Sequence, residues 1–426
     1  MLHHMNKICS VLFCVFLVES ASAQLPETGQ PKTIDLTYND AVKALAEQSL
    51  PLVAAHFDID ISEGELKQAR VWNNPHFNWN QDLYSIERNE YMNQSNQRLI
   101  QVDILFSIAG KHTRAVKLAK INVELNRLMY EDVKRSLIYE LGVQFYTLHA
   151  LQQKEALYEI VLSQFKTLID AYEVQFRVGA IPGNELIRLK SELLALQTTV
   201  INNQNEANEA MSQIRSMLNL RSDMRIRTVE PTVSMPDPAT ISFSELLAKA
   251  QEVRPDYLLQ KKEIDYNVMN VKLQRSSAVP DVLFGYQPHD KGSNYVRPYS
   301  GIVLEVDLPL FDRNQGNIHA AKAKLEQARV NQEYAIVALD NELSSALYKM
   351  LNTDKALDNY NEAFLDKLKL ANENARENFN KKNISMLEYI DIQRIYIQTM
   401  HEYIDLKSQG MMNVKEVNFT VGTEIY

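Results

Sequence analysis

Long stretches without proline restrict most strongly how this chain of 426 residues can fold. No proline occurs from 76 to 181, from 183 to 230 or from 310 to 426. Because proline ends or kinks helices, such stretches permit helices far longer than the usual length of about 11–12 residues. Between Lys111 and Phe176 apolar residues recur at steps of three and four, as in a coiled coil. The sequence therefore predicts helices reaching about 100 Å rather than a compact domain.

The second feature is an internal duplication. The dipeptide Val-Asp at 102–103 recurs at 306–307, and at almost the same offset Phe176 recurs as Phe379. Repeats of this length are far longer than those of solenoid proteins. The predicted division is a signal peptide at 1–23, a first repeat at 24–220, a proline-containing linker at 221–240 and a second repeat at 241–426.

The first residues have the pattern of a cleavable export signal. Lys7 precedes a short apolar run at 8–18, and Ala-Ser-Ala follows at 21–23. The chain has two cysteines, Cys9 and Cys14, and both lie in this segment. The mature chain is therefore predicted to lack cysteine, which excludes disulfides, thiolate metal sites and cysteine nucleophiles.

Charge and motif content narrow the function further. Asp and Glu number 54 against 45 Lys and Arg, and the net charge of −9 disfavours a non-specific nucleic-acid binder. The sequence contains no G-x-G-x-x-G, P-loop or H-E-x-x-H motif, and no two histidines of the predicted mature chain are spaced i, i+4. We predict no enzyme activity, no cofactor and no dedicated metal site.

Each half also contains two segments in which apolar and polar residues alternate. Ile100, Val102 and Ile104 alternate with Gln101 and Asp103. Such alternation is typical of transmembrane barrel strands, although an ordinary soluble hairpin gives the same pattern. Its recurrence in both halves of an exported chain favours the barrel. The predicted strands lie at about 75–87, 97–108, 280–288 and 299–309.

Four strands are too few to close a barrel, and open sheet edges are not tolerated in lipid. We therefore predict that three copies of the chain supply twelve strands. The predicted fold class is an α+β membrane protein, in which a long coiled-coil-like helical tunnel joins a transmembrane β-barrel completed by trimerisation.

Two passages carry a resemblance to a known family. Residues Pro309-Leu-Phe-Asp-Arg-Asn-Gln-Gly316 resemble a passage of the TolC-type outer-membrane efflux channels, in their heavy-metal (CzcC-like) branch. Gly110-Lys-His-Thr-Arg114 is similar to the first-half counterpart, with His112 in place of an arginine. The resemblance covers residues 34 to about 415.

This resemblance implies a homotrimer with its barrel in the outer membrane and its helical tunnel in the periplasm. It implies passive export, with heavy-metal cations as the leading cargo, from a proton-driven inner-membrane pump through a periplasmic adaptor protein. Two alternatives stay open: a channel of the same fold for drugs or other small molecules, and a periplasmic coiled-coil scaffold without a barrel.

The resemblance also implies two sites at the periplasmic end. The turns between long helices would dock the adaptor through Arg177, Val178, Gly179, Lys381 and Lys382. The alternative for the basic residues is that they complement the dipoles of the helix ends.

Glu388 and Asp391 match the spacing of the family's pair of acidic residues, with Glu in place of the first Asp. At i, i+3 they share one helix face, and a trimer would place six carboxylates around the channel entrance. Such a ring favours cations. The alternative is that both are solvated acids near the start of a helix.

The remaining candidate residues are predicted to make the junctions from strand to helix. In the second half Pro309 would end a strand, Asp312 or Asn314 would cap the next helix, and Gly316 would permit close packing. Gly110 lies at the corresponding junction of the first half.

Overall fold

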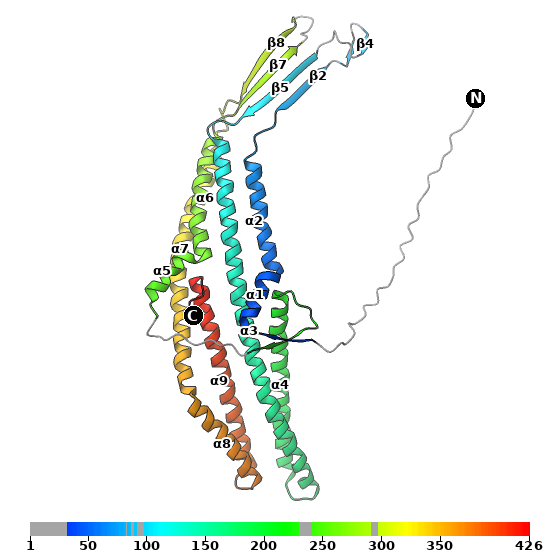
Figure 1. Cartoon of the computed structure of the whole chain (residues 1–426), viewed down its shortest axis with the longest axis vertical. Helices are drawn as coiled ribbons and strands as arrows, with labels where there is room; N and C mark the ends of the chain where they lie inside the picture. Colours follow the sequence, from blue (N-terminus) through cyan, green and yellow to red (C-terminus); the bar gives the residue numbers. More distant parts are fainter. Residues whose placement is uncertain (1–31, 82, 87–88, 92–97, 230–240, 291–296) are drawn as a thin grey trace, which may run out of the picture.

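The structure is a computed structural model that describes residues 32–426 except 82, 87–88, 92–97, 230–240 and 291–296. The predicted signal peptide and most of the predicted linker lie outside the described residues. The chain forms a long, narrow molecule with a sheet at one end and two helix-to-helix turns at the other (Figure 1). Within the described part, no helix is both long and apolar enough to cross a membrane.

The same order of elements, two helices, two strands and then long helices, occurs twice along the chain. The first set comprises α1 (Tyr38–Gln48), α2 (Leu50–Ala69), β2 (His76–Gln81), β5 (Arg98–Phe106), α3 (Lys111–Arg177) and α4 (Gly183–Met217). The second comprises α5 (Phe243–Val253), α6 (Pro255–Ser277), β7 (Val282–Asp290), β8 (Tyr299–Val306), α7 (Gln315–Leu357), η2 (Asp358–Tyr360), α8 (Glu362–Asn380) and α9 (Met386–Val421). The repeat boundaries drawn from the sequence stay a prediction.

Four antiparallel strands form the main sheet in the order β2-β5-β7-β8. β5, β7 and β8 lie where the alternation predicted them, and β7 extends slightly beyond the predicted segment. β2 ends at Gln81, although the predicted strand continued to about residue 87. Val102 of β5 lies opposite Tyr286 of β7, so hairpins from the two halves form one sheet. β2 and β8 are its edges. A short hairpin of β3 (Tyr84–Ser85) and β4 (Glu90–Tyr91) follows β2 and was not predicted.

A second small sheet joins the start of the first repeat to the predicted linker and was also not predicted. β1 (Thr33–Leu36) pairs in parallel with β6 (Arg225–Thr228). The guanidinium of Arg227 donates two hydrogen bonds to the Asp35 carboxylate, with N–O distances of 2.6 and 2.7 Å. Strands this short give alternation too few residues to identify them.

The long helix of the first half is continuous, whereas its counterpart is broken. α3 has 67 residues, and its bounds agree with the rod predicted from Lys111 to Phe176. In the second half α7 ends at Leu357, and α8 begins after the 3₁₀ turn η2. Asn361 caps α8, because its side-chain oxygen accepts a hydrogen bond from the Phe364 amide. The proline-free stretch gave no sign of this break.

A network of charged residues fixes the end of α9 halfway along the molecule. Arg135 of α3 donates to the Phe419 carbonyl at 2.8 Å, and Arg254 donates to the Thr420 carbonyl at 3.2 Å. Asp256 accepts from Arg254 at 2.7 and 2.8 Å and lies 3.3 Å from Arg135. Two arginines thus bind carbonyls of the last helical turn, where few helical amides remain to donate and a positive charge favours the helix. Burial would raise the pKa of Asp256, but the hydrogen bonds from Arg254 and the charges of both arginines outweigh it and lower the pKa.

We expect Asp256→Asn to destabilise the protein by about 1–2 kcal/mol at neutral pH, because a partly buried, charge-assisted pair of bonds is lost. The lowered pKa means that the ionised carboxylate stabilises the fold above about pH 4 and that this contribution is lost as the pH falls through the folded-state pKa. Thermal unfolding of the detergent-solubilised protein across pH checks this. Asp265→Asn, at an exposed carboxylate of the same helix, is the matched control and should change little. An Asp256→Asn deficit that persists undiminished in acid would contradict the assignment.

Candidate functional site

The two helix-to-helix turns have the same backbone geometry. Gly179 and Lys382, at equivalent places in the two halves, both have positive φ angles, of 74° and 60°. The Gly179 amide donates to the Phe176 carbonyl at 3.0 Å, and the Lys382 amide donates to the Phe379 carbonyl at 2.9 Å. The amide of the residue after each also donates to a carbonyl of the preceding helical turn, at 2.9 and 2.8 Å. Both turns are therefore Schellman caps, in which a left-handed residue ends the helix.

The structure brings the two turns together at one end of the molecule (Figure 1). One apolar cluster packs both helix pairs, and it includes Phe165 and Leu186 from the first half and Phe379 and Tyr389 from the second. Phe379 stacks on Tyr389 with ring centroids 4.7 Å apart. The predicted docking residues Arg177, Val178, Gly179, Lys381 and Lys382 are all exposed at these turns. Lysine at the second left-handed position was not predicted, since glycine is the residue that favours it.

Glu388 and Asp391 lie on the exposed face of α9, near its start. The opposite face, with Met386, Tyr389 and Ile390, packs into the apolar cluster at the turns. The side-chain oxygen of Ser385 accepts a hydrogen bond from the Glu388 amide at 3.2 Å, so Glu388 also lies in the first turn, where a negative charge favours the helix. The geometry is compatible with both the entrance ring and the solvated-acid alternative.

An ion pair that the sequence did not reveal lies one turn further along α9. Arg394 donates hydrogen bonds to the carboxylate of Glu192 on α4, one of them 2.9 Å long. This bond raises the pKa of the Arg394 guanidinium, and the nearby charge of Asp391 acts in the same direction. The pair joins the two helix hairpins just above the turns. Two residues so far apart in the sequence give no local signal of such a contact.

At the other end, both long helices begin with a residue in the left-handed conformation. Gly110 and Asn314, again at equivalent places in the two halves, are the N-caps of α3 and α7, with φ angles of 71° and 58°. The Asn314 side chain does not cap its own helix but donates to the Gln274 carbonyl at 2.8 Å. Asp312 accepts from the Asn314 amide at 2.8 Å. The predicted side-chain cap of α7 is therefore wrong, and Asn314 instead fastens α7 to α6.

Two further details of this junction differ from expectation. A Cβ atom added at Gly316 would meet nothing within 4 Å in the described chain, so the predicted close packing there is not observed. Pro309 does not end β8 directly, because the strand already ends at Val306.

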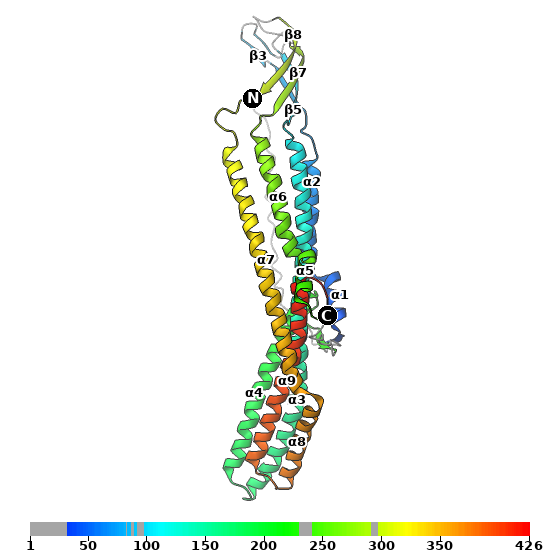
Figure 2. The same cartoon turned by 90° about the vertical axis from the view of Figure 1, so that its left-hand side faces the viewer.

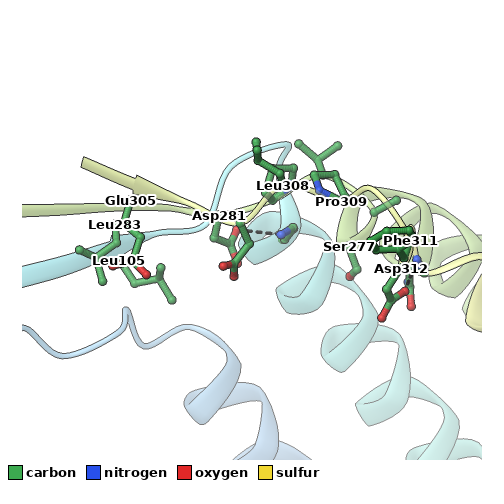
Figure 3. Close-up of a pocket in the computed structure, with 15 residues that line it drawn as sticks. Leu105, Ser277, Asp281, Leu283, Glu305, Leu308, Pro309, Phe311 and Asp312 are labelled. Atoms are coloured by element: carbon green, nitrogen blue, oxygen red, sulfur yellow. Dashed lines mark hydrogen bonds and ion pairs between the residues drawn. The ribbon is translucent and has the colours of Figure 1, made fainter. Parts of the chain in front are cut away.

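A cavity of about 640 Å³ lies where the strands meet the helices (Figure 3). Carboxylates of Asp281, Glu305, Asp307 and Asp312 line it together with the Lys111 ammonium. Lys111 Nζ lies 2.8 Å from Asp281 Oδ1, which ties the start of α3 in the first half to the start of β7 in the second. Among the described residues, no group of three or more His, Cys, Asp or Glu side chains is placed to hold a metal ion.

A long helical rod, an open antiparallel sheet and paired helix turns together define the class of outer-membrane channel subunits, and the comparisons agree. The family model described as "Outer membrane efflux protein" matches residues 41–220. This match to the first half of the chain agrees with the resemblance seen in the sequence. This similarity is the reason to regard the chain as an efflux channel protein and not as an enzyme.

Known relatives extend this similarity over nearly the whole chain. The cobalt-zinc-cadmium resistance protein CzcC of Cupriavidus metallidurans is 21% identical over 412 residues, which are 96% of each protein. The solved structure of CusC has a TM-score of 0.71 at 16% identity, covering 92% of this chain and 93% of that one. The CmeC outer membrane channel of Campylobacter jejuni has a TM-score of 0.75 at 15% identity, covering 90% and 85%. The structural likenesses show the shared fold.

Proposed function

We propose that three copies of this chain form a closed channel that exports heavy-metal cations across the outer membrane. The observation that carries the proposal is that the sheet and the layer of helices next to it are both open in the single chain, and that both expose apolar residues. In the sheet the free edges are β2 and β8. On β8, Ile302 and Leu304 are 73% and 69% exposed. A sheet in lipid has to close, and four strands cannot do so alone.

The helices next to the sheet have the same property. They are arranged in the order α2, α3, α6 and α7, with α2 and α7 at the edges (Figure 2). Exposed apolar residues follow one face of α2 at helical spacing, namely Leu50, Val53, Phe57 and Ile61. On α7 the exposed apolar residues include Val330, Tyr334 and Val337. Rotational repetition would bring α2 of one copy against α7 of the next, which closes a ring.

The half nearer the turns continues this pattern on α4. Ile187, Leu194 and Ile201 recur at heptad spacing and are 67%, 63% and 56% exposed. A heptad stripe of this kind is typical of a helix that packs against another helix. Twelve strands from three copies exceed the minimum for a closed barrel. The tunnel would then extend into the periplasm, where an adaptor protein and an inner-membrane pump supply the substrate.

Heavy-metal cations are the proposed cargo because the relative that matches 96% of this chain is described as a cobalt-zinc-cadmium resistance protein. The acidic pair Glu388 and Asp391 suits cations at the proposed entrance. Deleting the gene and measuring growth on graded cobalt, zinc, cadmium and a panel of drugs tests the cargo. We expect the deletion strain to be sensitive to metals, and we expect the wild-type gene to restore its resistance. Sensitivity to drugs alone would favour the small-molecule alternative, and a monomer in native mass spectrometry would contradict the channel.

Adaptor docking at the turns has its own test. Gly179→Leu places a side chain on a left-handed residue at a strain of about 1–2 kcal/mol, and an added Cβ there meets nothing within 4 Å. We therefore expect trimers at normal levels in the membrane but loss of metal efflux, measured as growth and metal accumulation. Gly110→Leu is the matched control, because Gly110 has a similar left-handed φ angle of 71° and equally open surroundings but lies at the other end of the molecule. Normal efflux by Gly179→Leu would contradict docking at this turn.

A further inference from the structure

The polar face of the sheet contains a paired imidazole and carboxylate that the proposed channel does not yet use. His76 of β2 lies directly opposite Asp103 of β5 in the strand register. His76 Nδ1 and Asp103 Oδ2 are 3.6 Å apart. The imidazole is 74% exposed, whereas the carboxylate side chain is only 7% exposed. This pair is a different site from the acidic residues on α9.

The carboxylate of Asp103 is held in place by its neighbours on two strands. Gln101 Nε2 donates a hydrogen bond to Asp103 Oδ1 at 2.6 Å, and Gln287 Nε2 of β7 donates to Gln101 Oε1 at 2.7 Å. Gly285 lies opposite Asp103 on β7, and a Cβ atom there would come within 2.3 Å of Asp103 Oδ1. The glycine thus leaves room for the carboxylate, and the two amides orient it. Asp103 Oδ2 is left facing His76.

The separation of the two donor atoms suits a shared metal ion better than a hydrogen bond. A distance of 3.6 Å exceeds the usual hydrogen-bond range of about 2.7–3.2 Å. Two donors bound at about 2.1 Å to one tetrahedral ion lie roughly 3.4 Å apart. An imidazole with a carboxylate selects divalent transition-metal cations such as Zn²⁺ over Mg²⁺ or Ca²⁺, which prefer oxygen alone. The hydrogen bonds from the Gln101 and Gln287 amides resemble those that orient the ligands of metal sites in other proteins.

We infer that His76 and Asp103 form a weak binding station for divalent transition-metal cations on the inner wall of the barrel. The inference rests on the proposed channel, because strand alternation then turns this polar face towards the lumen and the apolar face towards lipid. Two protein ligands are fewer than the three or four of tight zinc sites. Weak binding is what conduction needs, since an ion has to leave as readily as it enters. Three copies would give three stations around one lumen.

Histidine footprinting of the detergent-solubilised full chain tests the site whether or not the channel conducts. Diethyl pyrocarbonate modification is quantified by mass spectrometry at His76 and at His319, an exposed histidine of α7. We expect Zn²⁺ to protect His76 but not His319, and Mg²⁺ at equal concentration to protect neither. Asp103→Asn should raise the Zn²⁺ concentration needed for half protection by about tenfold or more, and Gln101→Leu should have a smaller effect in the same direction. Equal His76 reactivity with and without Zn²⁺ would overturn the inference.

Conductance separates this inference from the channel proposal itself. Single-channel currents are recorded in planar bilayers with the Glu388→Ala, Asp391→Ala protein, so that the proposed entrance ring does not contribute. We expect Zn²⁺ on the barrel side to reduce the current, and His76→Ala to weaken this block by about tenfold or more, while Glu305→Gln on the same face leaves the preference for Zn²⁺ over Mg²⁺ intact. Zn²⁺ block that is unchanged by His76→Ala overturns the station alone, whereas absence of any channel overturns the proposed function.

Discussion

A lysine at Leu304 should prevent the protein from assembling into outer-membrane trimers. Leu304 is 69% exposed on the apolar face of β8. It lies opposite Phe284, which in turn lies opposite Ile104, so the three form one row across the sheet. A lysine facing the middle of the bilayer costs about 2–4 kcal/mol, and a trimer incurs this cost three times. Heat-modifiable migration and outer-membrane fractionation measure the outcome, and Ile104→Lys should behave in the same way.

The neighbouring residue supplies the matched control. Glu305 follows Leu304 on the same strand but faces the polar side of the sheet, because successive side chains alternate. Glu305→Lys should therefore assemble normally, although it changes the charge of the proposed lumen. Normal assembly of both Leu304→Lys and Ile104→Lys would refute the assignment of this face to lipid. Failure of Glu305→Lys as well would show that the sheet tolerates no lysine on either face.

These strands could be predicted because alternation is a local signal. In β5, Ile100, Val102 and Ile104 all lie on one face, and this is visible within a few residues of sequence. The continuous helix α3 was equally accessible, since proline is absent and apolar steps of three and four persist throughout it. Because the chain is duplicated, the same pattern of elements could be predicted from each half separately. The pairing of β5 with β7, which joins the hairpins of the two halves, is a contact between distant segments and came only from the structure.

Features that depend on distant contacts or on few residues were missed. Asn361 caps the start of α8 after the break, but an asparagine alone does not identify a cap, because many asparagines cap no helix. The parallel pairing of β1 with β6 joins the start of the first repeat to the predicted linker, nearly two hundred residues further along the chain. At the second junction Gly316 was predicted to permit close packing, whereas the residue with the left-handed conformation is Asn314. The duplication could have identified Asn314, because Gly110 occupies the equivalent position of the first half. Asparagine is a non-glycine residue that readily adopts the left-handed conformation.

The sequence predicted which residues belong to the candidate site, but it did not predict the contacts that these residues make. Gly179 was expected at a turn between long helices, and it lies there in the left-handed conformation, with a φ angle of 74°. The ion pair of Arg394 with Glu192 was not predicted from the sequence. It matters for the entrance, because Arg394 follows Asp391 by about one helical turn and its charge is already engaged by Glu192. Asp391 is therefore only partly compensated, and an acidic ring remains chemically reasonable.

Removing both acids of this proposed ring should reduce cation selectivity and divalent-ion block of the channel. Glu388 and Asp391 are exposed and share one face of α9. In a trimer the double substitution Glu388→Ala, Asp391→Ala removes six negative charges from one constriction. Crowded carboxylates repel one another, and a bound cation relieves that repulsion, so the wild-type ring should bind divalent ions and the variant should not. Single-channel recording in planar bilayers, with reversal potentials in a salt gradient and added Mg²⁺, measures both properties.

The matched control removes the same charge from another helix of the same half of the molecule. Glu362 and Asp366 are exposed acids near the start of α8. The α8 substitutions Glu362→Ala and Asp366→Ala together should leave selectivity and divalent block unchanged, because screening in salt confines the effect of a charge to about 10 Å. Wild-type selectivity in the Glu388→Ala, Asp391→Ala channel would mean that these residues are ordinary solvated acids at a helix start. Equal losses in both double variants would instead make selectivity a property of the overall charge of the tunnel, with no gate at α9.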